Sequence, residues 1–268
     1  GGEGMNAGAA GAGKRSDNEE QGNRNGTNMS TALSIIEMCY GDTGLLLSMP
    51  RQGLGNSAIA AVANDEQLER FKGTWAAMAI TEPGCGSDSA AIRTTATKDG
   101  DDYILNGEKI FVTSGERADS VVVWATLDKK LGRAAIKSFV VPKGTAGMKV
   151  ERLEHKLGIK ASDTAVISFI DCRVPAENLL GNAEVDIVKG FAGVMETFDN
   201  TRPLVAAMAI GCAKASLERI KEIFKDELDA DYKTPYLQTS NLAAQIYRME
   251  AEWEAARLLT IKATWMAD

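Results

Sequence analysis

The hydrophobic periodicity of this 268-residue chain changes twice, and that change limits its possible folds more than any other feature. Over residues 30–71 apolar side chains recur at helical spacing, with breaks at Gly41 and Pro50 that suggest two or three helices. Short alternating segments bounded by turn residues follow and predict strands. The helical period returns from about residue 184 to residue 266. The pattern predicts an α+β fold, with a middle antiparallel β domain between N-terminal helices and a C-terminal helical bundle.

The middle region contains eight candidate strands. Their turns include Asp99-Gly100 and Asn106-Gly107, which are typical of hairpins because both central positions of a type I′ turn need positive φ angles. The candidate strands are residues 75–80, 92–97, 103–105, 109–113, 120–127, 138–141, 148–153 and 165–170.

Composition excludes several classes of function. A formal net charge of −7 and a pI near 5.0 argue against a protein that neutralises nucleic-acid phosphates or binds anionic membranes. The longest apolar runs fall far short of the ~20 residues that span a bilayer.

Histidine and cysteine usage narrows the chemistry further. His155, the single histidine, is flanked by charged residues and is expected in a solvent-facing loop. One histidine leaves little material for a histidine-based metal site or a serine–histidine relay, and we predict no metal. The four cysteines are widely spaced, without a CxxC pair or a hydrophobic signal peptide, which favours a cytoplasmic protein.

The strongest candidate for a binding loop is the segment AITEPGCGSD at residues 79–88. A strand-like stretch ends there in a run rich in glycine and small hydroxyl side chains. Pro83 fixes one φ angle, while Gly84 and Gly86 permit backbone conformations closed to other residues, so consecutive amides can point at the oxygens of a ligand. Taken alone, the same pattern is also typical of an ordinary tight turn.

Four further segments occur in the order and at the spacing found in the acyl-CoA dehydrogenases. They are NGEKIFVTSG at 106–115, KLGIKASDT at 156–164, DCRVP at 171–175 and FDNTRP at 198–203. Five ordered matches on one chain form a specific signal. From about Asn28 to Asp268 the chain resembles this FAD-dependent enzyme family.

The resemblance implies a domain order of helices, β domain and helices, with FAD between the β domain and the C-terminal bundle. Residues 1–28 are rich in glycine, asparagine and charged residues and are expected to be a disordered or inserted polar segment. The resemblance assigns part of an N-terminal helical domain to 29–73, the middle β domain to 74–182 and part of the C-terminal helical domain to 183–268. The first helices and the last third of a typical member have no counterpart, so the chain is expected to be an internal fragment with an incomplete bundle.

The resemblance also implies which residues bind FAD. The Thr81 hydroxyl and main-chain amides would meet the polar edges of the isoalloxazine, Phe111 would lie against the ring, and Thr113 would lie near N5, which accepts hydride. Without the resemblance, Phe111 would be an ordinary inward-facing strand residue. The full expected cofactor set is Met78, Ala79, Ile80, Thr81, Gly86, Ser87, Phe111, Val112 and Thr113.

The implied reaction is α,β-dehydrogenation of a fatty acyl-CoA to the trans-2-enoyl-CoA. A carboxylate removes the α proton while the β hydride passes to FAD, and hydrogen bonds to the thioester carbonyl stabilise the developing enolate charge. Pro203 is expected to kink a helix beside the substrate, because it cannot donate to the Asp199 carbonyl. The expected substrate residues are Ser87, Asp199, Asn200, Thr201 and Arg202. The implied partners are an electron-transfer flavoprotein and further copies of the chain, as a tetramer or dimer.

The chain departs from the family at the catalytic carboxylate. Most members carry a glutamate in a segment that would lie beyond Asp268, and others carry it at the position of Thr201. Glu196 lies about 140° from Thr201 around an ideal helix and should not substitute. We therefore predict no catalytic base within this chain, which alone would be inactive, and a base downstream in the complete protein.

Two other functions stay open. A non-catalytic subunit of a heteromeric dehydrogenase could keep the acyl-CoA and FAD contacts and take the base from a partner. A flavin-dependent monooxygenase or an acyl-CoA oxidase on the same scaffold would react with oxygen instead of an electron-transfer protein. Acyl chain length is not readable from one sequence, because pocket depth depends on helix packing.

Overall fold

The computed structural model describes residues 26–50, 54–185, 192–229 and 231–268. The chain divides into two compact units. Among the described residues, the first unit lies within 47–199, and the second consists of 26–46 with the part of the chain after residue 199. The polar segment expected at 1–28 lies outside the described residues except for its last three.

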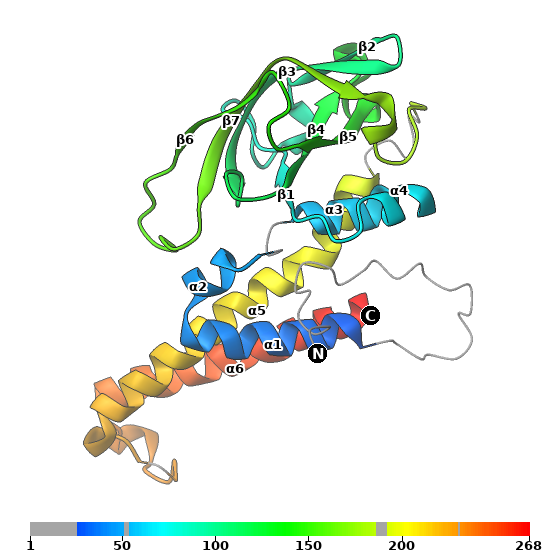
Figure 1. The fold of residues 1–268 in the computed structure, drawn as a ribbon. Coiled ribbons are helices and arrows are strands. Elements are labelled where there is room, and N and C mark those ends of the chain that lie inside the picture. The colour runs from blue at the N-terminus through cyan, green and yellow to red at the C-terminus, as the bar shows by residue number, and fades with distance from the viewer. Residues whose placement is uncertain (1–25, 51–53, 186–191, 230) are drawn as a thin grey trace, which may run out of the picture. The chain divides into compact units, whose positions relative to one another are not determined.

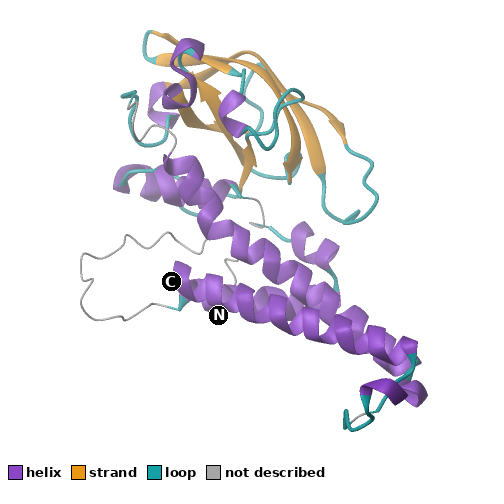
Figure 2. Ribbon diagram, turned by 180° about the vertical axis from the view of Figure 1, so that it is seen from behind, coloured by secondary structure: helices purple, strands orange, loops and turns teal. Residues whose placement is uncertain are grey.

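The first unit contains a seven-stranded sheet (Figures 1 and 2). The strand order is β1-β4-β2-β3-β7-β6, and β5 pairs with β4. Most pairs are antiparallel as expected, but β1 and β2 both run parallel to β4, which the long connections between these strands allow. The strands are β1 (Ala76–Ala79), β2 (Thr95–Asp99), β3 (Asp102–Thr113), β4 (Ser120–Thr126), β5 (Ile136–Pro142), β6 (Met148–Leu153) and β7 (Thr164–Pro175).

The apolar core of this unit forms on both faces of β4, all of whose residues are buried. Because side chains alternate along a strand, Val121 and Val123 join one cluster while Val122 and Trp124 join another. The second cluster includes residues of α3 (Gly55–Val62), so this helix covers one face of the sheet. The remaining short helices of the unit are α4 (Asp65–Arg70), η1 (Ser89–Ala91), η2 (Lys129–Ala135) and η3 (Ala176–Asn178).

The second unit is helical. It contains α1 (Thr27–Gly41), α6 (Asn241–Ala267) and the part of α5 (Ala192–Ile223) that follows Asp199, with η4 (Lys225–Glu227) and η5 (Tyr236–Gln238) between α5 and α6. A Cβ atom at Gly211 would lie 2.2 Å from the Ile36 carbonyl oxygen, so α1 and α5 pack closely there. The Trp253 indole N–H donates to the Ile210 carbonyl at 3.1 Å and ties α6 to α5.

The helix boundaries follow the sequence signals. The first helix ends at Gly41 as expected, α2 (Thr43–Ser48) ends just before Pro50, and α5 continues through Pro203. Among the described residues, α1 to α4 precede the sheet, where two or three helices were expected. Short helices such as α2 and α4 leave too little periodicity to be separated in the sequence.

One turn prediction was wrong. Asp99-Gly100 does lie at the hairpin of β2 and β3, but Asp99 pairs with Asp102, so the two-residue loop is Gly100-Asp101, in which only Gly100 has a positive φ angle. Asn106-Gly107, however, lies inside the continuous strand β3, where the pairing with β7 shifts register. A Cβ atom at Gly107 would lie 2.3 Å from Thr94 Oγ1, so this glycine permits a close approach of the residue that precedes β2 and does not form a turn.

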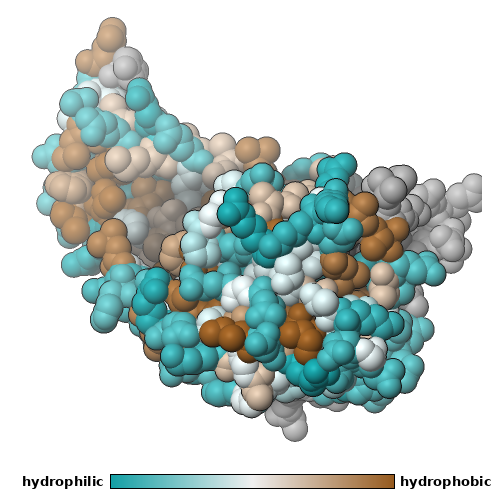
Figure 3. All heavy atoms as spheres, turned by 90° about the horizontal axis from the view of Figure 1, so that it is seen from above, coloured by the Kyte–Doolittle hydropathy of each residue, from teal (hydrophilic) through white to brown (hydrophobic). Residues whose placement is uncertain are grey.

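The face shown in Figure 3 is mostly hydrophilic, with separate hydrophobic patches. His155 is exposed, as its charged neighbours predict. Among the helices that the structure describes, none combines the length and apolar character needed to cross a bilayer.

Candidate cofactor site

The loop after β1 is a closed turn. The amide of Glu82 donates to the Cys85 carbonyl at 2.9 Å, and the amide of Cys85 donates to the Glu82 carbonyl at 3.1 Å. Pro83 and Gly84 therefore occupy the tip, where the fixed φ angle of Pro83 favours a tight turn. Neither Gly84 nor Gly86 has a positive φ angle, so the loop does not use the glycine-specific backbone conformations that were expected. These two reciprocal hydrogen bonds fix the backbone conformation of the loop.

Strand β3 presents Phe111 beside this loop. The pairing of β3 with β7 is irregular between Lys109 and Val112, and Phe111 adopts a φ angle of 58°, a strained value for a bulky residue. Its side chain is 61% exposed, so Phe111 is not an inward-facing strand residue. The amide of Ile110 donates to the Thr81 carbonyl at 2.9 Å, which fixes Phe111 next to the start of the loop.

A buried ion pair joins the loop to β3. Lys109 Nζ lies 2.8 Å from Glu82 Oε1, and the two side chains are 0% and 6% exposed. The same carboxylate accepts hydrogen bonds from the Thr94 amide and hydroxyl at 2.9 and 2.6 Å and from the Arg93 amide at 2.7 Å. Lys109 donates a second bond to the Ile80 carbonyl at 3.0 Å.

Burial opposes charge on both partners. It acts to raise the pKa of Glu82, but the charge of Lys109 and the hydrogen bonds from Lys109, Thr94 and the Arg93 amide together bring that pKa below its ordinary value. Burial lowers the pKa of Lys109, and the charge of Glu82 opposes this shift. Glu82 is therefore a carboxylate at neutral pH, satisfied on both oxygens.

The residues of the loop and β3 fit a flavin. An isoalloxazine needs a flat apolar contact and hydrogen-bonding groups along its polar edges. Phe111 offers an exposed ring, and the Thr81 and Thr113 side chains are half-buried. A Cβ atom at Gly86 would lie 3.9 Å from Thr81 Cγ2, so this glycine also lies at the site.

The other expected cofactor residues divide by exposure. Ala79, Ile80 and Val112 are buried, so only their main-chain atoms could meet a cofactor. Met78 is half-buried and Ser87 is exposed. The roles of all nine residues stay predictions. Within the described parts of the chain, no three histidine, cysteine or acidic side chains gather as a metal site would require.

The expected substrate residues fall in both units. Asp199 and Arg202 on α5 are exposed, whereas Thr201 is only 4% exposed. The side chain of Asn200 lies outside the described residues. Asp199 ends the first unit, which also contains Ser87, and the next three residues belong to the second unit. Their common contact with a substrate therefore stays a prediction.

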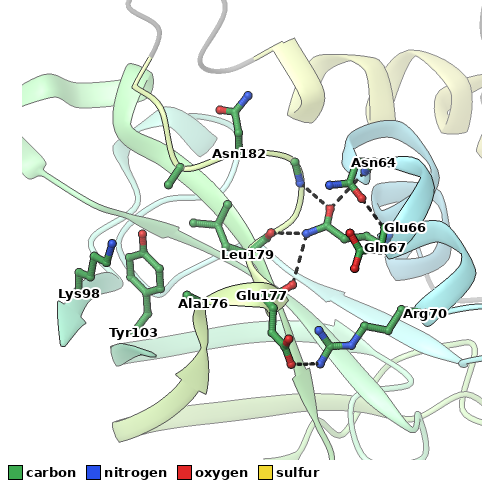
Figure 4. Close-up of a pocket in the computed structure, with 12 residues that line it drawn as sticks. Asn64, Glu66, Gln67, Arg70, Lys98, Tyr103, Ala176, Glu177, Leu179 and Asn182 are labelled. Atoms are coloured by element: carbon green, nitrogen blue, oxygen red, sulfur yellow. Dashed lines mark hydrogen bonds and ion pairs between the residues drawn. The ribbon is translucent and has the colours of Figure 1, made fainter. Parts of the chain in front are cut away.

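A separate polar cavity of about 310 Å³ is lined by residues of α4, β2, β3 and the segment after β7 (Figure 4). Gln67 spans one wall: its Nε2 donates to the Leu179 carbonyl at 2.7 Å, and its Oε1 accepts from the Gly181 amide at 2.9 Å. None of the expected cofactor residues lines this cavity. Gln67 was not among the residues expected at a site, although the capping box that it forms with Asn64 is a recognisable sequence signal.

Two family models match the chain. Residues 77–172 match the middle domain of acyl-CoA dehydrogenases, and residues 188–268 match their C-terminal domain. Among curated proteins, cyclohex-1-ene-1-carbonyl-CoA dehydrogenase of Syntrophus aciditrophicus is 36% identical over 242 residues, and the short-chain specific acyl-CoA dehydrogenase of Clostridium acetobutylicum is 33% identical over 256 residues. These alignments cover 89% and 92% of this chain but 55% and 66% of the relatives, so the chain spans about half to two thirds of their length.

Solved structures agree with this assignment. Butyryl-CoA dehydrogenase from Megasphaera elsdenii matches with a TM-score of 0.76 and 34% identity, over 88% of this chain and 62% of that one. A chain from a structural study of the electron transferring flavoprotein of Acidaminococcus fermentans matches with a TM-score of 0.72 and 33% identity, over 88% and 63%. The matched domains, relatives and structures confirm the expected α+β fold and show that this chain belongs to the acyl-CoA dehydrogenase family of FAD-dependent flavoproteins.

Proposed function

We propose that this chain is part of a dehydrogenase that converts an acyl-CoA thioester to its trans-2-enoyl-CoA. The observation that carries the proposal is Phe111, whose strained backbone holds an exposed ring beside Thr81, where the family resemblance expects the flavin. Strained residues cluster at functional sites, where the surrounding structure holds them in place. Relatives that are short-chain specific, together with butyryl-CoA dehydrogenase among the structures, favour a short acyl chain.

In this proposal the chain binds and orients. Main-chain groups of residues 78–87 and the hydroxyls of Thr81 and Thr113 hydrogen-bond the cofactor, and Phe111 packs on its ring. FAD, when bound, supplies the acceptor for hydride. Ser87 and the segment from Asp199 to Arg202 bind the thioester.

No residue of this chain is assigned as the base that removes the α proton. Thr201 occupies one of the two positions that the family uses, and it carries no carboxylate. Electrons leave through an electron-transfer flavoprotein, and similarity to a chain studied with such a protein supports this partner. The enzyme acts as a cytoplasmic homo-oligomer.

The visible spectrum of the purified chain loaded with FAD, before and after anaerobic addition of butyryl-CoA, tests the proposal. Bleaching of the bound flavin would support dehydrogenation by this chain. Flavin that binds without bleaching is expected of this chain alone, because it has no assigned base. The same result in the complete protein would favour the second candidate, a non-catalytic subunit that binds acyl-CoA and FAD, which the absence of a carboxylate at Thr201 motivates. Failure to bind FAD would contradict both. Rapid reoxidation of the reduced flavin by oxygen would indicate an oxidase or monooxygenase.

A further inference from the structure

The side chains of Glu82 and Lys109 bind main-chain groups of other residues as well as each other. Through its carboxylate, Glu82 holds the amides of Arg93 and Thr94, two residues that precede β2. Lys109 holds the carbonyl of Ile80 at the end of β1. The pair therefore connects three parts of the chain: the loop, the entry to β2 and the middle of β3.

Two successive residues of β3 hold two successive carbonyls at the start of the loop. Lys109 Nζ binds the Ile80 oxygen at 3.0 Å, and the Ile110 amide binds the Thr81 oxygen at 2.9 Å. The next residue along β3 is Phe111. These two hydrogen bonds consequently fix the distance between the Thr81 main chain and the Phe111 ring.

An apolar pair of similar volume could fill this space but could not replace these bonds. Without Glu82 the Arg93 and Thr94 amides would lose their acceptor, and without Lys109 the Ile80 carbonyl would lose its donor. Buried main-chain groups left without partners are costly, so the loop would move to find new ones.

We propose that Glu82 and Lys109 act as a positioning pair that holds the Thr81 loop and Phe111 at the separation a bound isoalloxazine requires, without touching the cofactor. The inference rests on the proposed function. It assigns a role in cofactor binding to two buried residues that lie outside the expected cofactor set.

The test compares Glu82→Gln and Lys109→Met with a matched control, Glu69→Gln. Glu69 pairs with Lys72 at 3.3 Å in an exposed ion pair of the same unit, so the control makes the same chemical change without disturbing the loop. FAD affinity and the shape of the bound flavin's visible bands are measured for each variant of the full chain, alongside hydrogen exchange at the Ile110 amide. Glu82→Gln keeps the side-chain shape, so it carries the test if Lys109→Met does not fold.

We expect both variants to bind FAD at least about tenfold more weakly, with altered visible bands and faster exchange at Ile110, because hydrogen bonds that fix the loop are lost or weakened. The Glu69→Gln control should match the unmodified chain in all three measurements. If the unmodified chain binds FAD and the variants bind it equally well with unchanged bands, the positioning pair is disproved and the proposed function stands, even where thermal stability has fallen. If the unmodified chain binds no FAD, the proposed function fails and this role fails with it.

Discussion

At position 111 a glycine variant should be more stable than an alanine variant, which is the reverse of the usual order in a strand. An L-residue at positive φ costs roughly 1–2 kcal/mol, a cost that glycine avoids. We expect Phe111→Gly to be more stable than Phe111→Ala by about 1 kcal/mol in urea unfolding, since both variants lose the same ring. Ile170 on β7 is the control, because it is 67% exposed and has no positive φ. There the alanine variant should be the more stable, and the same order at both sites would contradict the strain.

The ionisation of Glu82 should affect how steeply the free energy of unfolding falls at acid pH. Its pKa in the folded chain lies below the ordinary value, so the folded state favours the carboxylate. The resulting stabilisation is complete above the ordinary glutamate pKa of about 4.3 and is lost as the pH falls through the lowered value. Between pH 3 and 7, the free energy of unfolding in urea should therefore fall less steeply with decreasing pH in Glu82→Gln than in Glu69→Gln. An equal pH dependence in the two variants would contradict the lowered pKa of Glu82.

Cys172 should resist alkylation in the folded chain. Burial raises its pKa to about 11, so the reactive thiolate is scarce at pH 8. Cys212 is exposed, and we expect iodoacetamide to modify it first, with mass spectrometry as the readout. The urea-unfolded chain is the control, in which both should react at similar rates. Because the folded state favours the neutral thiol, this residue's contribution to stability should be lost as the pH rises from about 9 to 11.

The loop and the β3 segment of the candidate cofactor site could be predicted from the sequence, but the buried ion pair that joins them could not. The glycine-rich loop and the segment containing Phe111 are each an unbroken stretch of sequence, so a sequence motif is enough to identify each of them. Lys109 lies within the same segment, but nothing in the sequence shows that its side chain points inward. That direction depends on the irregular pairing of β3 with β7, which is a property of two strands more than fifty residues apart.

Among the helices, the contact of α1 with α5 depends on Gly211. Alanine there would gain about 1 kcal/mol of helix propensity, but its Cβ would meet the Ile36 carbonyl oxygen at 2.2 Å and force the helices apart. We expect Gly211→Ala to lower the free energy of unfolding by about 1–3 kcal/mol, as overpacking does. Gly41, the last residue of α1, has open space around its Cβ position. Gly41→Ala is the control and should change stability by less than about 0.5 kcal/mol. Equal effects of the two changes would contradict the close contact.

The strands show which local signals can be trusted. Asp99-Gly100 marks the hairpin between β2 and β3, one residue before the two-residue loop itself. Asn106-Gly107 carries the same local preference, yet β3 continues through it because pairing with β7 outweighs the preference of two residues. Element type was therefore predictable from periodicity, whereas the continuity of β3 needed its partner strand.

For the chain as a whole, the two units should differ in protection from hydrogen exchange. Every residue of β4 is buried, whereas the buried residues of α6 are Ala243, Ile246, Thr260 and Thr264. Amides exchange fastest where few buried contacts oppose local opening. We expect peptides from α6 to exchange faster than peptides from β4 when followed by mass spectrometry. Equal rates would indicate that both units open in a single cooperative step.

The pairing of β3 with β7 sets an order of events during synthesis. Val112 pairs with Ala165 and Lys109 with Ile167, so the wall that carries Phe111 lacks its neighbour until β7 has left the ribosome. Long-range pairings of this kind form late because the intervening chain must first be closed into a loop. A nascent chain that stops before Thr164 would carry every residue of the expected cofactor set and still have no fixed surface to offer a flavin.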